Sequence, residues 1–312
     1  MSIGAGDYRI FRSRLREKFR GEVRDSRADR AVYATDSSNY RIPPKVIACP
    51  KDQDDLRILL RLARECRVPV TARGAGTSCA GNAIGPGVVI DYSRHLNRII
   101  KIDPEKRYAI VEPGVVQAQL QQAAAPYGLR FGPDPSTSSR CTIGGMIGNN
   151  ACGPHATAYG RTSDNVLELR LIDGLGREII AGQTPQDVPE APQDASVSDE
   201  QISQIPGLKS LVAANLATIR TEFGRFGRQV SGYSLEHLLP ENGPALAPFL
   251  SGTEGTLGVI TQATVRLVPL PKAPVLVALG FPDQIKLLPV QINPQLAENT
   301  FLVVAGIAPY HP

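Results

Sequence analysis

The hydrophobic positions of this chain repeat with two different periods, which predicts a fold of mixed helices and strands. Residues 53–66 carry apolar side chains at three- and four-residue spacing, as on one face of a helix: Leu56, Leu59, Leu60 and Ala63. Asp52 stands before this stretch as a predicted N-cap. The β-branched runs at residues 68–72 and 88–91 predict strands. A helix and strands in this order are typical of an α/β unit.

Two β-hairpins are predicted further along the chain. Residues 97–103 and 107–114 flank a short polar turn and predict the first hairpin. Residues 166–173 and 177–182 predict the second, because leucine recurs at every other position of the first of these strands. A last strand is predicted in residues 258–271, where β-branched residues dominate.

Three other stretches are expected to be helical, and one is expected to be a loop. Residues 8–30 are rich in arginine, with apolar positions that suit an amphipathic helix: Ile10, Phe11, Leu15 and Phe19. Residues 115–127 predict a helix that Gly128 ends. Residues 208–223 predict another helix. The polar, proline-rich residues 183–201 predict a loop or a disordered insertion.

A glycine-rich loop lies between the predicted strands of residues 70–91, the first glycine block. Its glycines would let the backbone come close to an anion, and consecutive N–H groups in such a loop form a concave nest for phosphate. Gly74 and Gly76 match the start of a Rossmann fingerprint, but Cys79 stands where its third glycine belongs. The loop also follows a helix and precedes a strand, the reverse of the Rossmann order. A phosphate cradle of another kind is favoured over a glycine-rich surface turn.

Two more glycine-rich stretches raise the weight of this hypothesis. The second glycine block, residues 132–166, has six glycines and many small hydroxyl residues. The third glycine block, residues 252–261, reads GTEGTLGVIT. In this order the three blocks resemble the FAD-binding domain of the p-cresol methylhydroxylase / vanillyl-alcohol oxidase superfamily. They are most similar to the FAD-linked D-2-hydroxy-acid dehydrogenases, which act on D-lactate, glycolate or D-2-hydroxyglutarate.

The resemblance implies an α+β fold and a division of the chain into three parts. A PCMH-type FAD-binding domain, made of two α/β subdomains with FAD between them, is expected in residues 35–271. A basic helical segment, residues 1–34, precedes it. Residues 272–312 show no resemblance and are expected to be a truncated cap domain or an aberrant C-terminus, since the resembled dehydrogenases continue with a substrate domain.

The resemblance also implies which residues hold the cofactor. Residues of the first block are expected around the pyrophosphate: Arg73, Gly74, Ala75, Gly76, Thr77 and Ser78. Residues of the second block are expected along the ribityl chain and ring: Asp134, Pro135, Thr142, Gly144, Gly145, Asn149, Gly153 and Gly160. In the third block, Glu254, Gly258 and Ile260 are expected near the adenine and ribityl portion. Covalent members carry a histidine at the place of Thr77, so FAD is expected to be bound non-covalently.

Two residues are candidates for a catalytic role in the resembled reaction. His155 could serve as a base of near-neutral pKa, or it could be a hydrogen-bonded loop histidine. Arg161 could contact a carboxylate substrate, or it could hold its loop through an ion pair with Asp164. Isolated histidines and scattered cysteines give no pattern of metal ligands, so no metal is expected.

The expected function is oxidation of a D-2-hydroxy acid to the 2-oxo acid by hydride transfer to FAD, with a downstream electron acceptor. A separately encoded cap or iron–sulfur subunit is an expected partner. One alternative is another enzyme on the same domain, such as an enolpyruvyl reductase that uses NADPH. The other is a non-catalytic flavin-binding fragment or subunit.

Composition and charge limit the kinds of partner and the cellular compartment that are expected for this protein. The net charge of +4 arises within residues 1–30, so the body of the protein is balanced and no nucleic-acid-binding face is expected. No apolar run reaches the roughly 18 residues of a membrane span. Five scattered cysteines suit reduced thiols, which indicates the cytoplasm, or a peripheral position at the inner face of the membrane.

Overall fold

The computed structural model of the chain describes six stretches, separated by short gaps: residues 5–182, 201–226, 229–243, 245–271, 275–281 and 300–306. The predicted loop of residues 183–201 lies outside them except for Gln201. Within the predicted tail, β11 (Val275–Phe281) and β12 (Thr300–Gly306) form a parallel pair.

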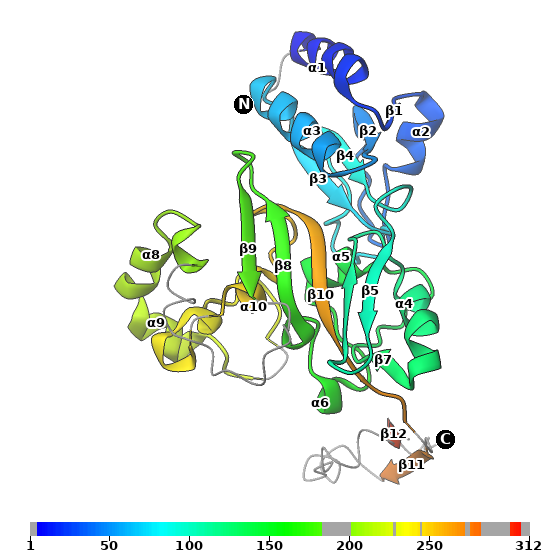
Figure 1. Cartoon of the computed structure of the whole chain (residues 1–312), viewed down its shortest axis with the longest axis vertical. Coiled ribbons are helices and arrows are strands. Elements are labelled where there is room, and N and C mark those ends of the chain that lie inside the picture. Colours follow the sequence, from blue (N-terminus) through cyan, green and yellow to red (C-terminus); the bar gives the residue numbers. More distant parts are fainter. Residues whose placement is uncertain are drawn as a thin grey trace, which may run out of the picture.

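A four-stranded sheet forms the first half of the molecule (Figure 1), with the strand order β1-β2-β4-β3. Its strands are β1 (Glu22–Arg24), β2 (Val46–Cys49), β4 (Val88–Asp91) and β3 (Val70–Arg73). β2, β4 and β3 are parallel, and β1 joins β2 in antiparallel orientation. Helix α3 (Gln53–Glu65) connects β2 to β3 and buries the predicted apolar face against the sheet. The prediction for this α/β unit is confirmed, including the Asp52 cap, which accepts a hydrogen bond from the Asp55 N–H.

The prediction of a single helix over residues 8–30 is wrong. Helix α1 (Ala5–Lys18) packs on α3, and the chain then enters the sheet as β1 before α2 (Arg27–Val32) begins. Gly21 allows this turn, because a Cβ there would lie 2.1 Å from the carbonyl oxygen of Cys49. Of the apolar positions that suggested the helix, Phe11, Leu15 and Phe19 are buried.

A six-stranded antiparallel sheet forms the second half and contains both predicted hairpins. Its main path is β5-β6-β10-β8-β9, and β7 pairs with the end of β10. The strands are β5 (Ile99–Asp103), β6 (Tyr108–Val111), β10 (Val259–Pro269), β8 (Val166–Ile172), β9 (Glu178–Gly182) and β7 (Leu129–Phe131). The two sheets with their helices give the predicted α+β fold.

Strand β10 occupies the centre of this sheet and pairs along both of its edges. Its residues align with β8 on one side and with β6 and then β7 on the other. Side chains alternate between buried and half-exposed along much of the strand. A strand from the end of the described domain therefore holds together segments that come from residues 108–172.

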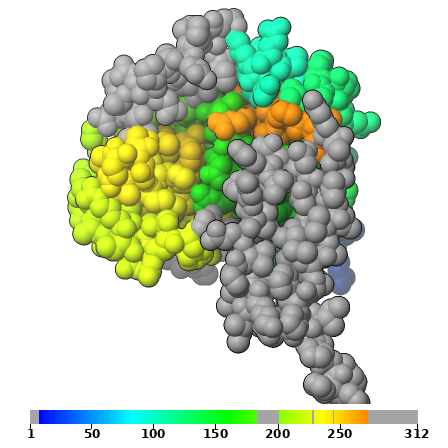
Figure 2. All heavy atoms as spheres, turned by 90° about the horizontal axis from the view of Figure 1, so that it is seen from below, coloured from blue at the N-terminus to red at the C-terminus, as the bar shows by residue number. Residues whose placement is uncertain are grey.

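Helices cover the second sheet and share its core. They are α4 (Gln117–Ala124), α5 (Ile143–Asn149), α6 (Ala156–Tyr159), α8 (Leu208–Ala214), α9 (Leu216–Glu222) and α10 (Leu246–Leu250). The α8–α10 region lies beside β9 and β8 (Figure 1) and adjoins the orange atoms of β10 in the view from below (Figure 2). Buried leucines of α8–α10 and of α4 join one hydrophobic cluster with the sheet.

Two predicted helices are shorter than expected. In the predicted helix of residues 115–127, the α-helix ends at Ala124 and a 3₁₀ turn follows, because Pro126 has no N–H to donate. Gly128 ends this turn in the left-handed conformation, as predicted. The helix of residues 208–223 is two helices. They meet at Asn215, whose side-chain amide donates to the Leu211 carbonyl.

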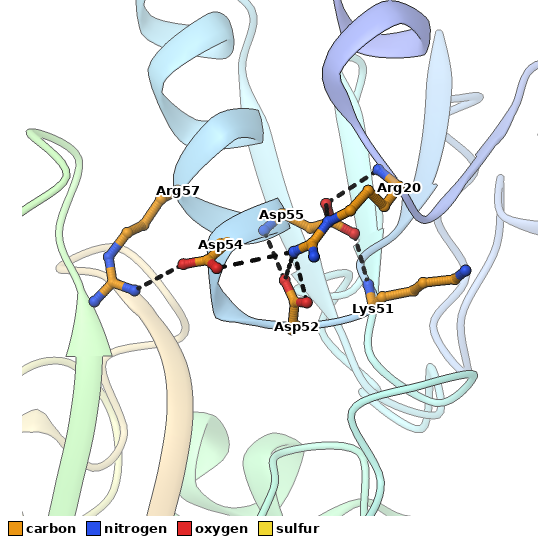
Figure 3. Close-up of polar contacts among 6 residues, drawn as sticks. All are labelled: Arg20, Lys51, Asp52, Asp54, Asp55 and Arg57. Atoms are coloured by element: carbon orange, nitrogen blue, oxygen red, sulfur yellow. Dashed lines mark hydrogen bonds and ion pairs between the residues drawn. The ribbon is translucent and has the colours of Figure 1, made fainter.

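A polar cluster fastens the N-terminal segment to the start of α3 (Figure 3). The carboxylate of Asp55 is fully buried and accepts the backbone N–H groups of Arg20 and Lys51 at 3.1 and 3.0 Å. The Arg20 guanidinium also donates to Asp52 at 2.6 Å, so the cap residue of α3 is itself paired. Asp54 lies 3.9 Å from the same guanidinium and is 76% exposed.

We expect Asp55→Ala to lower the free energy of unfolding by about 2 kcal/mol, because it leaves two N–H groups without an acceptor. Asp54→Ala is the matched control in the same helical turn and should cost less than about 0.5 kcal/mol, since the side chain is exposed. Urea unfolding followed by circular dichroism measures both. Equal losses for the two variants would contradict the role assigned to Asp55.

Candidate cofactor-binding site

Residues of all three glycine blocks meet at one cleft of about 480 Å³. It is lined by the loop after β3, by the start of β10 and by α5 with its flanking residues. These segments lie far apart in the sequence and come from both halves of the molecule. The volume falls in the range of ligand pockets, roughly 300–1,000 Å³.

The loop after β3 forms the first wall and is braced from behind. The Arg73 guanidinium donates to the carbonyl oxygens of Thr35 and Ala83 at 2.9 and 3.1 Å, which closes the loop on itself. It also stacks over the Tyr33 ring at 5.2 Å, and burial lowers its pKa from the ordinary arginine value. At the tip, the Gly76 carbonyl accepts the N–H of Ser37. Further along the loop, the N–H groups of Ala80 and Asn82 donate to the Ser78 hydroxyl, at 3.2 and 3.4 Å.

The two halves approach each other closely at Gly74. A Cβ at this position would lie 2.2 Å from the hydroxyl of Thr142, so any other residue would force the Thr142 side chain or the loop to shift. Thr142 in turn caps α5, because its hydroxyl accepts the N–H of Gly145 at 3.2 Å. The start of α5 therefore lies directly against the first glycine block.

The third glycine block closes the far end of α5. The N–H groups of Gly252 and Glu254 donate to the carbonyls of Ile147 and Gly148, at 2.8 and 3.0 Å. The side chain of Asn149 donates to the Glu254 carboxylate at 2.9 Å. Partial loss of hydration raises the pKa of Glu254, and this hydrogen bond opposes the rise. The second and third blocks thus form one continuous wall.

Most residues predicted to hold the cofactor line this cleft. They are Arg73, Gly74, Ala75, Gly76, Thr77, Ser78, Pro135, Thr142, Gly144, Gly145, Asn149, Glu254, Gly258 and Ile260. Three others lie outside the lining: Asp134, Gly153 and Gly160. Gly153 packs directly on Asp134, and Gly160 packs on Asp164 beside a different cavity.

The two catalytic candidates also lie outside the lining. The His155 ring is buried, and its Nδ1 is hydrogen-bonded to the carboxylate of Asp134. Arg161 pairs with Asp164 at 3.3 Å and donates to the Gln229 carbonyl at 3.3 Å. These contacts lie in and beside the loop between α5 and β8, and a catalytic role for either residue stays a prediction.

The structure adds lining residues that the sequence patterns did not single out, above all Tyr92 and Asn150. Tyr92 directly follows β4 and is 4% exposed, and Asn150 directly follows α5 and is 2% exposed. The Tyr92 hydroxyl and the Asn150 amide nitrogen are buried and have no hydrogen-bond partner among the described residues. Burial also raises the pKa of Tyr92, so the phenol stays protonated and can donate. No local spacing rule predicts such groups, because only the fold brings them to the cleft.

These features suit a long ligand rich in hydrogen-bond acceptors. The cleft combines a glycine-rich loop, which can bring backbone N–H groups close to a ligand, with the start of α5 and with apolar lining residues from both halves. FAD presents phosphate, ribityl and ring acceptors along such a length, so the residues present fit FAD. Among the described residues, His, Cys, Asp and Glu side chains form no group of three that could share a metal ion. In that same part of the chain, no helix is long and apolar enough to cross a membrane.

Comparison with known proteins agrees with this geometry. Residues 44–182 match a family described as "FAD binding domain". The chain is 36% identical over 286 residues to D-2-hydroxyglutarate dehydrogenase of Pseudomonas putida, covering 89% of this chain and 28% of that protein. It is 32% identical over 250 residues to glycolate oxidase subunit GlcD of Bacillus subtilis, covering 80% of this chain and 42% of that protein. The chain therefore spans well under half the length of these relatives.

A solved structure of alkyldihydroxyacetonephosphate synthase has a similar fold. The TM-score is 0.59 at 18% identity, over 85% of this chain and 45% of that one. The predicted resemblance and fold class are confirmed, and FAD is the cofactor to which the cleft corresponds.

We expect Gly76→Val to weaken FAD binding at least about tenfold, because valine at φ +69° is strained and its Cβ would lie 2.4 Å from the Arg73 guanidinium. Gly176→Val is the matched control. It carries similar strain at φ +85° in the β8–β9 turn, where an added Cβ meets nothing within 4 Å. Titration of each apoprotein with FAD, followed by flavin fluorescence, measures the affinities. A loss of the same size in both variants would contradict the cradle.

Proposed function

We propose that this chain, which contains an FAD-binding domain at residues 44–182, is the flavin-binding part of an enzyme that oxidises a D-2-hydroxy acid to the 2-oxo acid. The main observation that supports this proposal is that three glycine blocks, distant in the sequence, converge on one cleft between the two sheets. Relatives named D-2-hydroxyglutarate dehydrogenase and glycolate oxidase subunit support the substrate class. Bound FAD supplies a hydride acceptor.

In this proposal the first block, with Arg73, Gly74, Ala75, Gly76, Thr77 and Ser78, receives the pyrophosphate. Lining residues of the second block, with Thr142, Gly144, Gly145 and Asn149, follow the ribityl chain and ring. Asp134 and Gly153 support that wall from behind, since Gly153 packs on Asp134 and Asp134 holds His155. Glu254, Gly258 and Ile260 lie toward the adenine and ribityl portion.

The proposal assigns binding of the substrate carboxylate to groups beyond this cleft. Among the described lining residues Arg73 is the only lysine or arginine, and its guanidinium is already engaged by two loop carbonyls. A dicarboxylate needs further cations, because a buried carboxylate without a partner is costly. A cap or iron–sulfur subunit that carries them, together with a downstream electron acceptor, is the proposed partner. The name "glycolate oxidase subunit" of one relative supports this division.

The proposed location is the cytoplasm or the inner face of the membrane. All five cysteines lie within the described residues, and none forms a disulfide. This agrees with a reducing compartment.

We expect the purified protein to be yellow and to release its flavin on acid precipitation. Thr77 stands where covalent members have a histidine, and a threonine hydroxyl cannot form the histidyl–flavin bond. The test is the flavin absorbance of the supernatant and of the washed pellet. Flavin that stays with the pellet would refute non-covalent binding.

With D-2-hydroxyglutarate, D-lactate or glycolate, we expect the FAD-loaded chain alone to reduce a dye acceptor slowly or not at all, because its cleft lacks an available cation for the substrate carboxylate. Dithionite should still reduce the bound flavin, which shows that the cofactor is competent. Addition of the partner subunit should give activity with the D-enantiomer and not with the L-enantiomer. Brisk, saturable turnover by the chain alone would contradict this assignment. Inactivity with every D-2-hydroxy acid, even after the partner is added, would instead favour a non-catalytic flavin-binding subunit.

A further inference from the structure

The segment between α2 and β2 contacts the first glycine block repeatedly. It comprises residues 33–41, which we call the N-terminal strap, and an isolated β-bridge between Thr35 and Arg41 closes it on itself. The strap ends before residue 44, where the match to the FAD-binding family begins. Its contacts with the loop after β3 are therefore made by residues outside the matched part of the chain.

Tyr33 fixes the strap at the base of the loop. The Arg73 guanidinium lies over its ring, 5.2 Å from the centroid, and its hydroxyl donates to the carboxylate of Asp91, the last residue of β4. Burial raises the pKa of Tyr33, so the phenol stays protonated and can donate. Arg73 ends β3, and Asp91 pairs with it across the sheet. The start of the strap is therefore attached to both strands that flank the loop.

Ser37 holds the loop through its backbone. Its N–H donates to the carbonyl of Gly76 at 3.1 Å, and its hydroxyl lies 3.4 Å from the same oxygen. Gly76 has the left-handed conformation, at φ +69°. A trans peptide has its carbonyl and the following N–H on opposite sides, so this hydrogen bond directs the N–H of Thr77 away from the strap. Both Gly76 and Thr77 line the cleft.

Two further side chains attach the strap to the far part of the block. The Asp36 carboxylate accepts the N–H of Ser38 at 2.9 Å and the N–H of Ala83 at 3.4 Å, so it joins a turn of the strap to the loop. The ring of Tyr40 packs on Gly81, where an added Cβ would lie 2.9 Å from it. The strap thus contacts the block near its start, at Gly76 and again before β4.

We propose that the N-terminal strap is a positioning element for the cofactor, which holds the loop in the conformation that receives the pyrophosphate of FAD. This inference rests on the proposed FAD-binding role of the cleft and assigns part of the affinity to residues 33–41. A glycine-rich loop loses much backbone freedom when it becomes fixed. Because the strap orders the loop when the chain folds, less binding free energy is lost in ordering it when FAD binds.

The test is an FAD titration of the full-length apoprotein, followed by flavin fluorescence, for variants of the strap. Ser37→Pro removes the N–H that Gly76 accepts, whereas Ser37→Ala keeps it and is the matched control at the same position. Ser37→Pro should raise the dissociation constant for FAD about tenfold, and Ser37→Ala should leave it within about twofold.

A second variant is needed because proline also restricts the strap itself. Asp36→Ala removes the acceptor for two N–H groups and should raise the dissociation constant about fivefold, and Asp36→Asn, which keeps an acceptor oxygen, should restore part of the affinity. Asp25→Ala is the control, since that carboxylate pairs with Arg12 and Arg16 of α1 and has no hydrogen bond to the loop. It should lower the urea concentration at which the apoprotein unfolds and leave FAD affinity unchanged.

The inference is overturned if Ser37→Pro and Asp36→Ala both bind FAD within about twofold of the unaltered chain, or if the two controls weaken binding as much as they do. An unaltered chain that binds no FAD would overturn the proposed function, and this inference with it. Equal FAD binding by every variant would overturn this inference alone.

Discussion

The pairing of β10 with three other strands is the constraint on which the rest of the second half depends. Its residues form antiparallel ladders with β8, β6 and β7, so the sheet has no continuous centre without it. Yet β10 lies beyond residues 44–182, the part that matches the FAD-binding family. The strand also brings Ile260 and the third glycine block to the cleft. The strand that completes the sheet therefore also contributes to the cleft.

A second constraint is the contact between the two halves at Gly74 and Thr142. Because Gly74 has no side chain, the Thr142 hydroxyl of the other half lies close to the loop backbone. That hydroxyl also caps α5, so a single threonine links the first glycine block to the helix beside it. The loop side chains that could reach a ligand, such as Arg73, are largely used to hold the loop closed. Recognition in this cleft consequently falls to backbone donors and to a few fixed side chains.

This distribution of donors separates cofactor binding from substrate chemistry. In the proposed function, acceptor-rich FAD is held mainly by backbone N–H groups of the glycine-rich loop, which carry no net charge. A carboxylate substrate needs cationic partners, and the described cleft provides only the engaged Arg73. His155 Nδ1 is hydrogen-bonded to Asp134, and the Arg161 guanidinium is paired with Asp164. In the proposed function, cofactor binding and substrate recognition therefore rely on different groups.

The sequence alone determined the local elements and the identity of the cofactor. The periodicity that buries one face of α3, the short polar turn between β5 and β6, the alternation along β8 and the glycines that line the cleft are all properties of neighbouring residues. Neighbouring residues are enough because these patterns depend on local backbone geometry. The prediction from local pattern failed where a tertiary contact overrides it. At Gly21, for example, the chain leaves the predicted helix to join the sheet.

Only the tertiary structure decided which residues line the cleft. Asp134, Gly153 and Gly160 belong to the second glycine block, yet they lie outside the lining. Tyr92 lies outside all three blocks and Asn150 was not among the residues expected to hold the cofactor, yet both line the cleft. Whether a residue lines the cleft depends on every segment packed around it. Those segments come from distant parts of the chain, so the outcome is a property of the fold and of no single stretch of sequence.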